Sequence, residues 1–188
     1  MQGSVLIVGE ASCEDRPDDE LMNLVANGSQ AAFAVLVRRY QQPALQLALR
    51  LLGGADEAQD VVQNAFVKVF RHRRRYRKRG QFRAFFLKVV LNEARMKLRR
   101  KRRRMNLLQK MSRQIQTLSD NTVAVATNPN SWPLLQKVRR HYRDVIALRY
   151  GAELKLEEIA EVLQIPVGTV KSRLFNGLRE LKALLEAE

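Results

Sequence analysis

A run of cations lies near the middle of the chain, where seven of the nine residues from Arg71 to Arg79 are Arg or Lys. Like charges at this density repel one another, so the run needs either a solvated surface or a polyanion to offset it. Phosphates bind such cations, and unstacked bases stack on flat apolar side chains. Four aromatic residues lie within or just after the run: Tyr76, Phe82, Phe85 and Phe86. Cations and rings together favour a nucleic acid as the partner.

A second set of candidate contacts lies on a helix near the C-terminus. An arc of apolar residues predicts its buried face: Val170, Leu174, Leu178, Leu181 and Leu185. The opposite side offers groups that can contact base edges or phosphates: Lys171, Ser172, Phe175, Asn176 and Arg179. Arg173 lies to one side, nearer a phosphate backbone. An exposed ring such as Phe175 could equally be a satellite core contact, so both interpretations stay open.

Residues for catalysis or metal binding are sparse. The block from Phe66 to Arg104 carries eighteen Lys or Arg and one acid, Glu93. The two histidines of the chain, His72 and His141, fall in different predicted domains. A metal-dependent nuclease needs carboxylates or histidines that converge on an ion. A nucleic-acid enzyme is therefore a weak alternative, and we predict no catalytic residue, no metal and no cofactor.

Charge and composition narrow the class of partner further. The chain has 188 residues, a formal net charge of +15, and over half of its cations in the Phe66–Arg104 block. A membrane surface could also attract this charge, but the sequence shows no lipidation motif and no apolar span long enough to cross a bilayer. Cys13 is the only cysteine, so no intrachain disulfide forms and a reducing compartment is favoured. We expect a cytoplasmic protein without membrane insertion.

Helical periodicity of apolar residues runs through most of the chain, and strand alternation is nearly absent. A first helix near residue 18 ends at Asn27–Ser29, and a second follows it. Pro43 predicts the start of a further helix, which runs to Leu52. The next helix ends in the basic run, and one long helix is expected over Phe82–Arg104. The pattern predicts an all-α fold.

The elements group into two small helical domains. Residues 1–17 are predicted to be a loose tail, and residues 18–108 a helical bundle. Residues 109–133 are polar, contain two prolines and lack a sustained period, which predicts a flexible linker. In residues 134–188, a short helix from Leu156 to Leu163 is followed by "QIPVG" and the C-terminal helix. Two helices joined this tightly predict a helix-turn-helix.

These segments together resemble a bacterial sigma factor of the extracytoplasmic-function (ECF) group, group 4 of the sigma-70 family, which keeps only sigma regions two and four. The strings "DEAQDVVQNAFVKVFR" and "QFRAFFLKVVLNEARMKLRRKRR" are similar to parts of region two. The string "YRDVIALRYGAELKLEEIAEVLQIPVGTVKSRLFNGLRELK" is similar to region four. The resemblance implies a subunit that binds core RNA polymerase, recognises two promoter elements and promotes strand opening.

The resemblance also assigns candidate site residues. It implies that four residues bind the clamp of the largest subunit of core polymerase: Asp60, Val61, Gln63 and Phe66. The flap of the second subunit is a further implied partner. For the downstream promoter element and its melting, the matching positions are Arg74, Arg75, Tyr76, Arg77, Phe85, Lys88, Asn92 and Arg95. For the upstream element they are Thr169, Lys171, Ser172, Arg173, Phe175, Asn176 and Arg179. An anti-sigma factor is a further candidate partner.

Three positions depart from the family pattern. Phe85 stands where the family usually has Trp, which keeps a flat apolar group but removes a ring N–H donor. Asn176 stands where Arg is frequent, which changes the expected base preference. The Arg71–Arg79 run carries more charge than is usual, which predicts stronger unspecific binding. The main alternative is a stand-alone helix-turn-helix regulator of duplex DNA, which leaves the Phe66–Arg104 block without a role.

Overall fold

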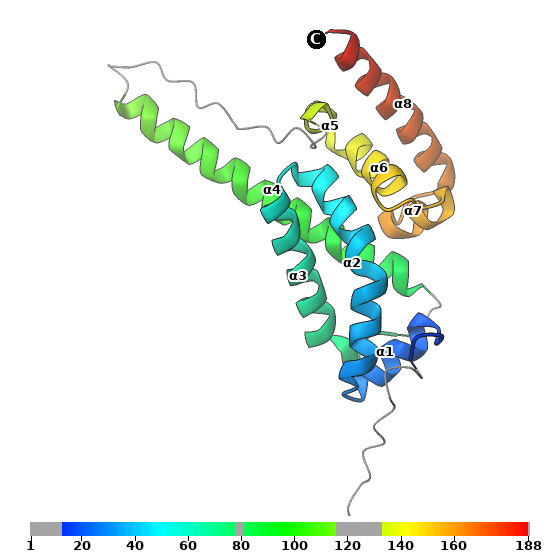
Figure 1. The fold of residues 1–188 in the computed structure, drawn as a ribbon. Coiled ribbons are helices and arrows are strands. Elements are labelled where there is room, and N and C mark those ends of the chain that lie inside the picture. Colours follow the sequence, from blue (N-terminus) through cyan, green and yellow to red (C-terminus); the bar gives the residue numbers. More distant parts are fainter. Residues whose placement is uncertain (1–12, 78–80, 116–132, 188) are drawn as a thin grey trace, which may run out of the picture.

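The computed structural model describes residues 13–77, 81–115 and 133–187, and side chains at 109–115 and 133 are not described (Figure 1). Within these ranges the regular structure is helical and contains no strand, which confirms the predicted all-α class. The helices are α1 (Asp18–Ala26), α2 (Gln30–Leu52), α3 (Ala55–Arg71), the short 3-10 helix η2 (Arg73–Arg75), α4 (Phe82–Ile115), α5 (Pro133–Lys137), α6 (Arg140–Gly151), α7 (Leu156–Leu163) and α8 (Val167–Glu186).

Helices α1 to α4 form a bundle around α2. Ser29 caps α2, because its hydroxyl accepts a hydrogen bond from the backbone N–H of Ala32 at 3.2 Å. Gly53 ends it with a left-handed backbone, φ 80°. The predicted break at Pro43 is wrong, since α2 is continuous through this residue. Buried residues on both sides of the proline, among them Tyr40 and Leu47, hold one helix against its neighbours and offset the lost backbone hydrogen bond.

Helix α4 is longer than the sequence predicted. It continues past Arg104 to Ile115, into the first part of the predicted linker, and its end extends beyond the bundle (Figure 1). Arg, Lys, Leu, Met and Gln dominate this stretch and are strong helix formers, so the chain stays helical without packing. Met105, Leu107 and Leu108 are accordingly exposed. The remainder of the predicted linker, residues 116–132, lies outside the described residues.

The predicted tail is partly ordered on the bundle. Residues 1–12 lie outside the described part of the chain, but Cys13 is fully buried. The guanidinium of Arg39 donates hydrogen bonds to the carbonyl oxygens of Glu14 and Arg16 and to the carboxylate of Asp18. Residues 13–17 therefore belong to the fold, because one arginine side chain satisfies several of their acceptors.

The second helical group packs directly on the first. Helix α6 lies against α2, and α7 lies against α4, so buried residues of both groups form one apolar cluster. A Cβ on Gly151, at the end of α6, would lie 3.2 Å from the Cα of Leu47 and 2.9 Å from the Cδ of Arg50. The absence of a side chain at Gly151 therefore allows α6 to approach α2 closely.

Helices α7 and α8 form the predicted helix-turn-helix. Gln164 turns the chain between them with a left-handed backbone, φ 55°. The buried face of α8 differs from the prediction, because Leu178 and Leu185 are exposed. The residues that pack inward are Val170, Leu174, Gly177, Leu181 and Leu184. A Cβ on Gly177 would lie 2.9 Å from Tyr142 and 3.0 Å from Ile146, so this glycine brings α6 against α8 and shifts the packed face.

Candidate nucleic-acid interface

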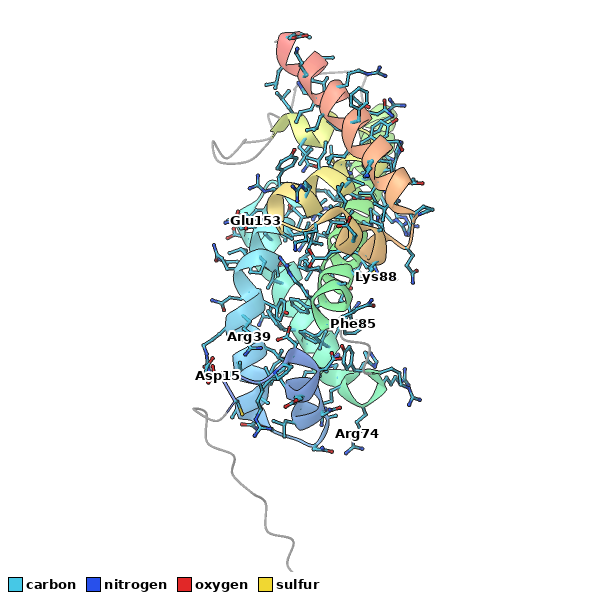
Figure 2. All side chains as sticks on the ribbon, turned by 90° about the vertical axis from the view of Figure 1, so that its right-hand side faces the viewer. Asp15, Arg39, Arg74, Phe85, Lys88 and Glu153 are labelled. Carbon is cyan, nitrogen blue, oxygen red and sulfur yellow. The ribbon has the colours of Figure 1, made fainter. Side chains whose placement is uncertain are left out.

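The basic run begins at the end of α3 and continues through η2. The guanidinium of Arg73 stacks on the ring of Phe70 at 4.5 Å and donates to the Phe70 carbonyl at 3.0 Å, so this cation supports the local turn. Arg74, Arg75 and Arg77 are exposed, and no ion pair is recorded for them within the described residues. Figure 2 shows Arg74 pointing away from the bundle. Three cations of the run therefore face solvent, where phosphates can reach them.

A cavity of about 470 Å³ lies beside these arginines, between the loop and α4. Its lining combines cations with a flat ring: Arg75 and Arg77 from the loop, Phe85 and Lys88 from α4, and Tyr76 between them. Phe85 is 38% exposed, whereas Phe82 and Phe86 are buried in the core and stack on each other at 6.0 Å. Of the four rings near the basic run, Phe82 and Phe86 therefore belong to the core, and Tyr76 and Phe85 remain at the cavity.

Tyr76 positions the loop over this cavity. Its ring lies 5.2 Å from that of Phe85 and 5.7 Å from that of Phe82, and its hydroxyl donates a hydrogen bond to the Asp19 carboxylate. Burial of the phenol, then the hydrogen bond to Asp19, raises the pKa of Tyr76 well above its ordinary value. The phenol therefore stays neutral, and one edge of its ring remains on the cavity wall.

Lys88, Asn92 and Arg95 follow one another along α4 at spacings of four and three, which places them on one stripe. Lys88 lines the cavity and Asn92 is exposed. Arg95 differs from both, since its guanidinium is paired with the carboxylate of Asp144 on α6 at 2.8 Å. The stripe thus offers one cation and one amide, while its third member already has an anionic partner.

The residues predicted to bind core polymerase divide into buried and exposed groups. Val61 is buried in the bundle, where it stabilises the packing of α3. Asp60 and Gln63 are exposed, and Asp60 forms an ion pair with Lys97 of α4 at 3.0 Å. Phe66 is buried at the floor of an apolar groove between α2 and α3. Asp60 and Gln63 can contact another protein directly, whereas Phe66 can be contacted only through the groove.

That groove is a surface feature that the sequence alone did not reveal. Its apolar lining comes from both helices: Phe33, Val37, Leu45, Val62, Phe66, Val67 and Phe70. Four glutamines line it as well: Gln41, Gln42, Gln59 and Gln63. Apolar residues at spacings of three and four on each helix were the available signal. The groove can hold an apolar helix whose polar groups meet the amides.

The outer face of α8 carries most of the residues predicted for upstream DNA. Lys171, Phe175 and Arg179 recur at a spacing of four on one stripe, and Phe175 is 68% exposed. Ser172 is exposed as well, although its hydroxyl donates to the carbonyl of Thr169 at 3.0 Å. The half-buried residues are Thr169, Arg173 and Asn176, at the flank of the packed face. The exposed stripe can enter a major groove with its cations and its ring.

The anchoring of α8 comes from the start of α6. Arg139 donates from its backbone N–H and from its Nε to the two carboxylate oxygens of Glu180, both at 2.8 Å. Burial alone would raise the pKa of Glu180, but the hydrogen bonds from Arg139 outweigh it and lower that pKa. The pair therefore holds α8 against the start of α6 at Glu180.

The described residues offer neither a metal site nor a membrane span. Within the described ranges, His, Cys, Asp and Glu side chains form no group of three or more that could hold a metal ion. Among the helices described, none has both the length and the apolar character needed to span a membrane.

Comparison with known proteins gives consistent matches over both helical groups. The family model described as Sigma-70 region 2 matches residues 36–104, and that described as Sigma-70, region 4 matches residues 134–183. The ECF RNA polymerase sigma factor SigW of Bacillus subtilis (strain 168) is 32% identical over 173 residues. That alignment covers 86% of this chain and 92% of SigW.

Two solved structures share the fold. CnrH, solved in complex with the cytosolic domain of CnrY, is 26% identical with a TM-score of 0.68, covering 92% of this chain and 99% of that one. The sigma factor RpoE of Bartonella quintana, solved with the anti-sigma factor NepR, is 20% identical with a TM-score of 0.58. The match covers 81% of this chain and 98% of the RpoE chain, and it shows a likeness of fold.

Proposed function

Because the chain belongs to the ECF group of sigma-70 factors and is an RNA polymerase sigma factor, we propose that it binds core polymerase through α2 and α3 and contacts promoter DNA through two separate surfaces. The first DNA surface is the basic loop with the cavity beside α4, and the second is the outer stripe of α8. The alternative of a stand-alone helix-turn-helix regulator is not favoured, since region two matches as well.

The observation that carries the proposal is the cavity lined by Arg75, Tyr76, Arg77, Phe85 and Lys88. A base turned out of a duplex loses its stacking partners, at a cost of a few kcal/mol. A half-exposed ring can replace that stacking, while neighbouring cations hold the flanking phosphates. This combination suits an opened strand of the downstream promoter element. Asn92 is uncharged and exposed on the same helix, so we assign it a contact to a base or sugar.

The polymerase surface is the exposed face of α3 with its adjoining groove. Asp60, Gln63 and Val67 lie on one exposed stripe, and the groove supplies an apolar floor beside it. We assign this surface to the clamp helices of the largest polymerase subunit. The flap of the second subunit is the candidate partner of the C-terminal domain, where exposed Leu178 and Leu185 offer apolar area.

An anti-sigma factor is a further proposed partner, and the fold shared with a sigma factor solved in such a complex supports it. The protein itself is proposed to catalyse no bond chemistry, because the polymerase supplies the reaction. Its proposed place is the cytoplasm, since bacterial polymerase and promoter DNA lie there. Copurification with core polymerase from the same host is the direct check on these partners.

Strand opening by the holoenzyme tests the assigned cavity. The variant changes Arg74, Arg75 and Arg77 together to Gln. The control changes Arg99, Arg100 and Arg103, which are exposed cations farther along α4, to Gln. Both triple variants remove three charges. We expect the loop variant to lose opening, measured as reactivity of unpaired thymines, far more than the control. If the loop variant opens normally on a pre-melted template and only binds weakly, the loop holds phosphates and has no melting role.

A further inference from the structure

Two adjacent aspartates begin α1, and each accepts a hydrogen bond from a tyrosine elsewhere in the chain. The Asp18 carboxylate accepts from the hydroxyl of Tyr40 on α2 and from the guanidinium of Arg39. The Asp19 carboxylate accepts from the hydroxyl of Tyr76, 57 positions further along the chain. Neighbouring side chains on a helix point about 100° apart. This is why Asp18 reaches α2 while Asp19 reaches the basic loop.

The rings of the two tyrosines lie in different surroundings. Tyr40 is buried, and its ring packs on those of Phe82 and Phe86 in the core. Tyr76 is half-buried, with its ring 5.7 Å from buried Phe82 and 5.2 Å from exposed Phe85. The Asp18 bond therefore stabilises the core, whereas the Asp19 bond holds a ring that lines the cavity.

The position of Tyr76 also fixes its neighbours in the sequence. Arg75, Tyr76 and Arg77 are consecutive, and all three line the cavity. Phe85 and Lys88 line it from α4, a long helix that cannot follow a movement of the loop. A hydroxyl that donates to a carboxylate forms a charge-assisted hydrogen bond, roughly twice as strong as a neutral one. A single bond therefore sets the position of the loop wall relative to α4.

We infer that Asp19 is a positioning residue for the opened strand, because through Tyr76 it holds the loop wall where a base can stack on Phe85. The inference rests on the proposed role of the cavity, and it adds α1 to the elements that act on promoter DNA. Asp19 is absent from the described residues that line the cavity, so its effect on a base passes through Tyr76.

The charge of Asp19 acts in the opposite direction. A carboxylate near the loop repels phosphates, so its removal should by itself strengthen binding of DNA. The inference requires that loss of the bond to Tyr76 outweighs this gain. A weaker complex after removal of an acidic side chain is therefore a result that net charge alone does not produce.

Two substitutions at this position separate the hydrogen bond from the charge. Asp19→Asn removes the charge, but its amide oxygen can still accept from the Tyr76 hydroxyl. Asp19→Ala removes both the charge and the acceptor. Asp18→Ala is the matched control, because it removes the same charge one residue earlier and leaves the bond to Tyr76 in place. It should lower stability more than Asp19→Ala, since it loses contacts to both Tyr40 and Arg39.

The measurement uses holoenzyme formed with each variant and a fluorescent single-stranded oligonucleotide that carries the downstream element of a promoter opened by the wild type. Fluorescence anisotropy gives the affinity, and urea unfolding of the free chains gives the stability. We expect Asp19→Ala to lower the affinity about five-fold, the size of a weakened contact between one base and a ring. Asp19→Asn and Asp18→Ala should bind within about two-fold of the wild type, or more tightly, because they retain the bond and remove a repulsive charge.

A second set of oligonucleotides tests whether Asp19 acts at a base. Each carries one abasic nucleotide, and the position that lowers wild-type affinity most identifies the base held in the cavity. On that strand Asp19→Ala should bind as the wild type does, because the stacking that Tyr76 supports is already absent. Tyr76→Phe keeps the ring but lacks the hydroxyl, so it should reproduce Asp19→Ala. The double variant should show no further loss, since both changes remove the same bond.

Several results would overturn the inference. If Asp19→Asn binds as weakly as Asp19→Ala, the carboxylate serves the N-terminus of α1 and not the loop. Equal losses on the intact and abasic strands, or an equal loss in Asp18→Ala, would indicate a general loss of stability. If Phe85→Ala and the abasic scan lower the affinity but Asp19→Ala does not, the inference fails and the proposed function stands. If neither Phe85→Ala nor any abasic nucleotide lowers the affinity, the cavity holds no base and both fail.

Discussion

Arg95 and Asp144 form an ion pair across the two helical domains, with two hydrogen bonds from the guanidinium of Arg95 to one oxygen of a carboxylate that is almost completely buried. Asp144 lies on α6 of the C-terminal domain, whereas Arg95 lies on α4 of the N-terminal bundle. The pair therefore forms only when the two domains dock. The carboxylate of Asp144 is largely removed from water and has Arg95 as its nearest cation, with Arg140 at a longer 3.8 Å.

Removal of this carboxylate should therefore destabilise the docked chain. We expect Asp144→Ala to lower the free energy of unfolding by about 1 to 3 kcal/mol, because Arg95 loses its partner in a half-buried site. Urea unfolding followed by circular dichroism measures the change. Glu186→Ala is the control, since Glu186 pairs with Lys182 at the exposed end of α8. Equal midpoints for Asp144→Ala and the wild type would show that the pair contributes nothing.

The groove between α2 and α3 can be tested with a charge at its edge. Val67→Asp should weaken core-polymerase binding by about 1 to 2 kcal/mol, because a carboxylate in an apolar interface loses its hydration. Leu107→Asp makes a similar change on the α4 extension, where the side chain is already exposed. Affinity is measured by titration of labelled protein with core polymerase. If both variants bind equally well, the groove lies outside the interface.

Charge reversal at Asp60 should also weaken the polymerase complex, since this side chain shares the exposed face of α3 with Gln63. Asp60→Lys also loses the ion pair with Lys97, an exposed contact of small energetic value. Helicity of the free chain should therefore be retained while core affinity falls. Unchanged affinity would remove this edge of α3 from the polymerase surface.

Phe175 should read a base rather than stabilise the fold, because its ring is largely exposed on α8. Phe175→Ala should cost about 1 to 3 kcal/mol at the preferred upstream element and much less at a scrambled one. Lys171→Ala should instead reduce the salt dependence of binding by roughly one phosphate contact on both DNAs. Binding isotherms at several salt concentrations distinguish the two. A uniform loss for Phe175→Ala would indicate a packing defect.

Substitution of two glycines of α8 by Ala should change stability in opposite directions. Gly177→Ala should destabilise the chain by about 1 to 3 kcal/mol, because the new Cβ would lie only 2.9 Å from Tyr142 and 3.0 Å from Ile146, which is closer than van der Waals contact. Gly168→Ala has no atom within 4 Å of its new Cβ and should stabilise the helix by up to about 1 kcal/mol. Thermal unfolding of both variants measures the difference. A neutral Gly177→Ala would mean that α6 and α8 can separate freely.

Alkaline pH should loosen the loop through Tyr76. Because the pKa of Tyr76 is raised by burial and by its bond to Asp19, its contribution to stability is complete below pH 10.0 and is lost as pH rises above that value. Tyr76→Phe keeps the ring but cannot ionise, so its stability should fall less steeply above pH 10.0, with a residual slope from Tyr40, whose pKa is also raised by burial. Identical slopes in urea unfolding at several alkaline pH values would contradict this assignment.

Local patterns were sufficient to predict most of the helices. Apolar spacing of three and four identified α1, α3, α7 and α8, since an amphipathic helix needs no distant contact to show its period. The same approach failed where tertiary packing overrides a local signal: at Pro43, and on α8, where Gly177 shifted the buried face. The density of cations from Arg71 to Arg79 indicated nucleic acid, although two of the four neighbouring rings proved to be core.

The sequence by itself determined an all-α chain, the sigma family and the stripe on α8, because these depend on residue types at short, regular spacings. Only the tertiary structure decided which side chains are available. It buried Val61, Phe82 and Phe86 and formed the groove beside Gln63. It also paired Arg83 with Glu158 and Arg95 with Asp144, which lie far apart in the chain. Such contacts depend on how helices dock, and docking energy comes from surfaces that no single segment contains.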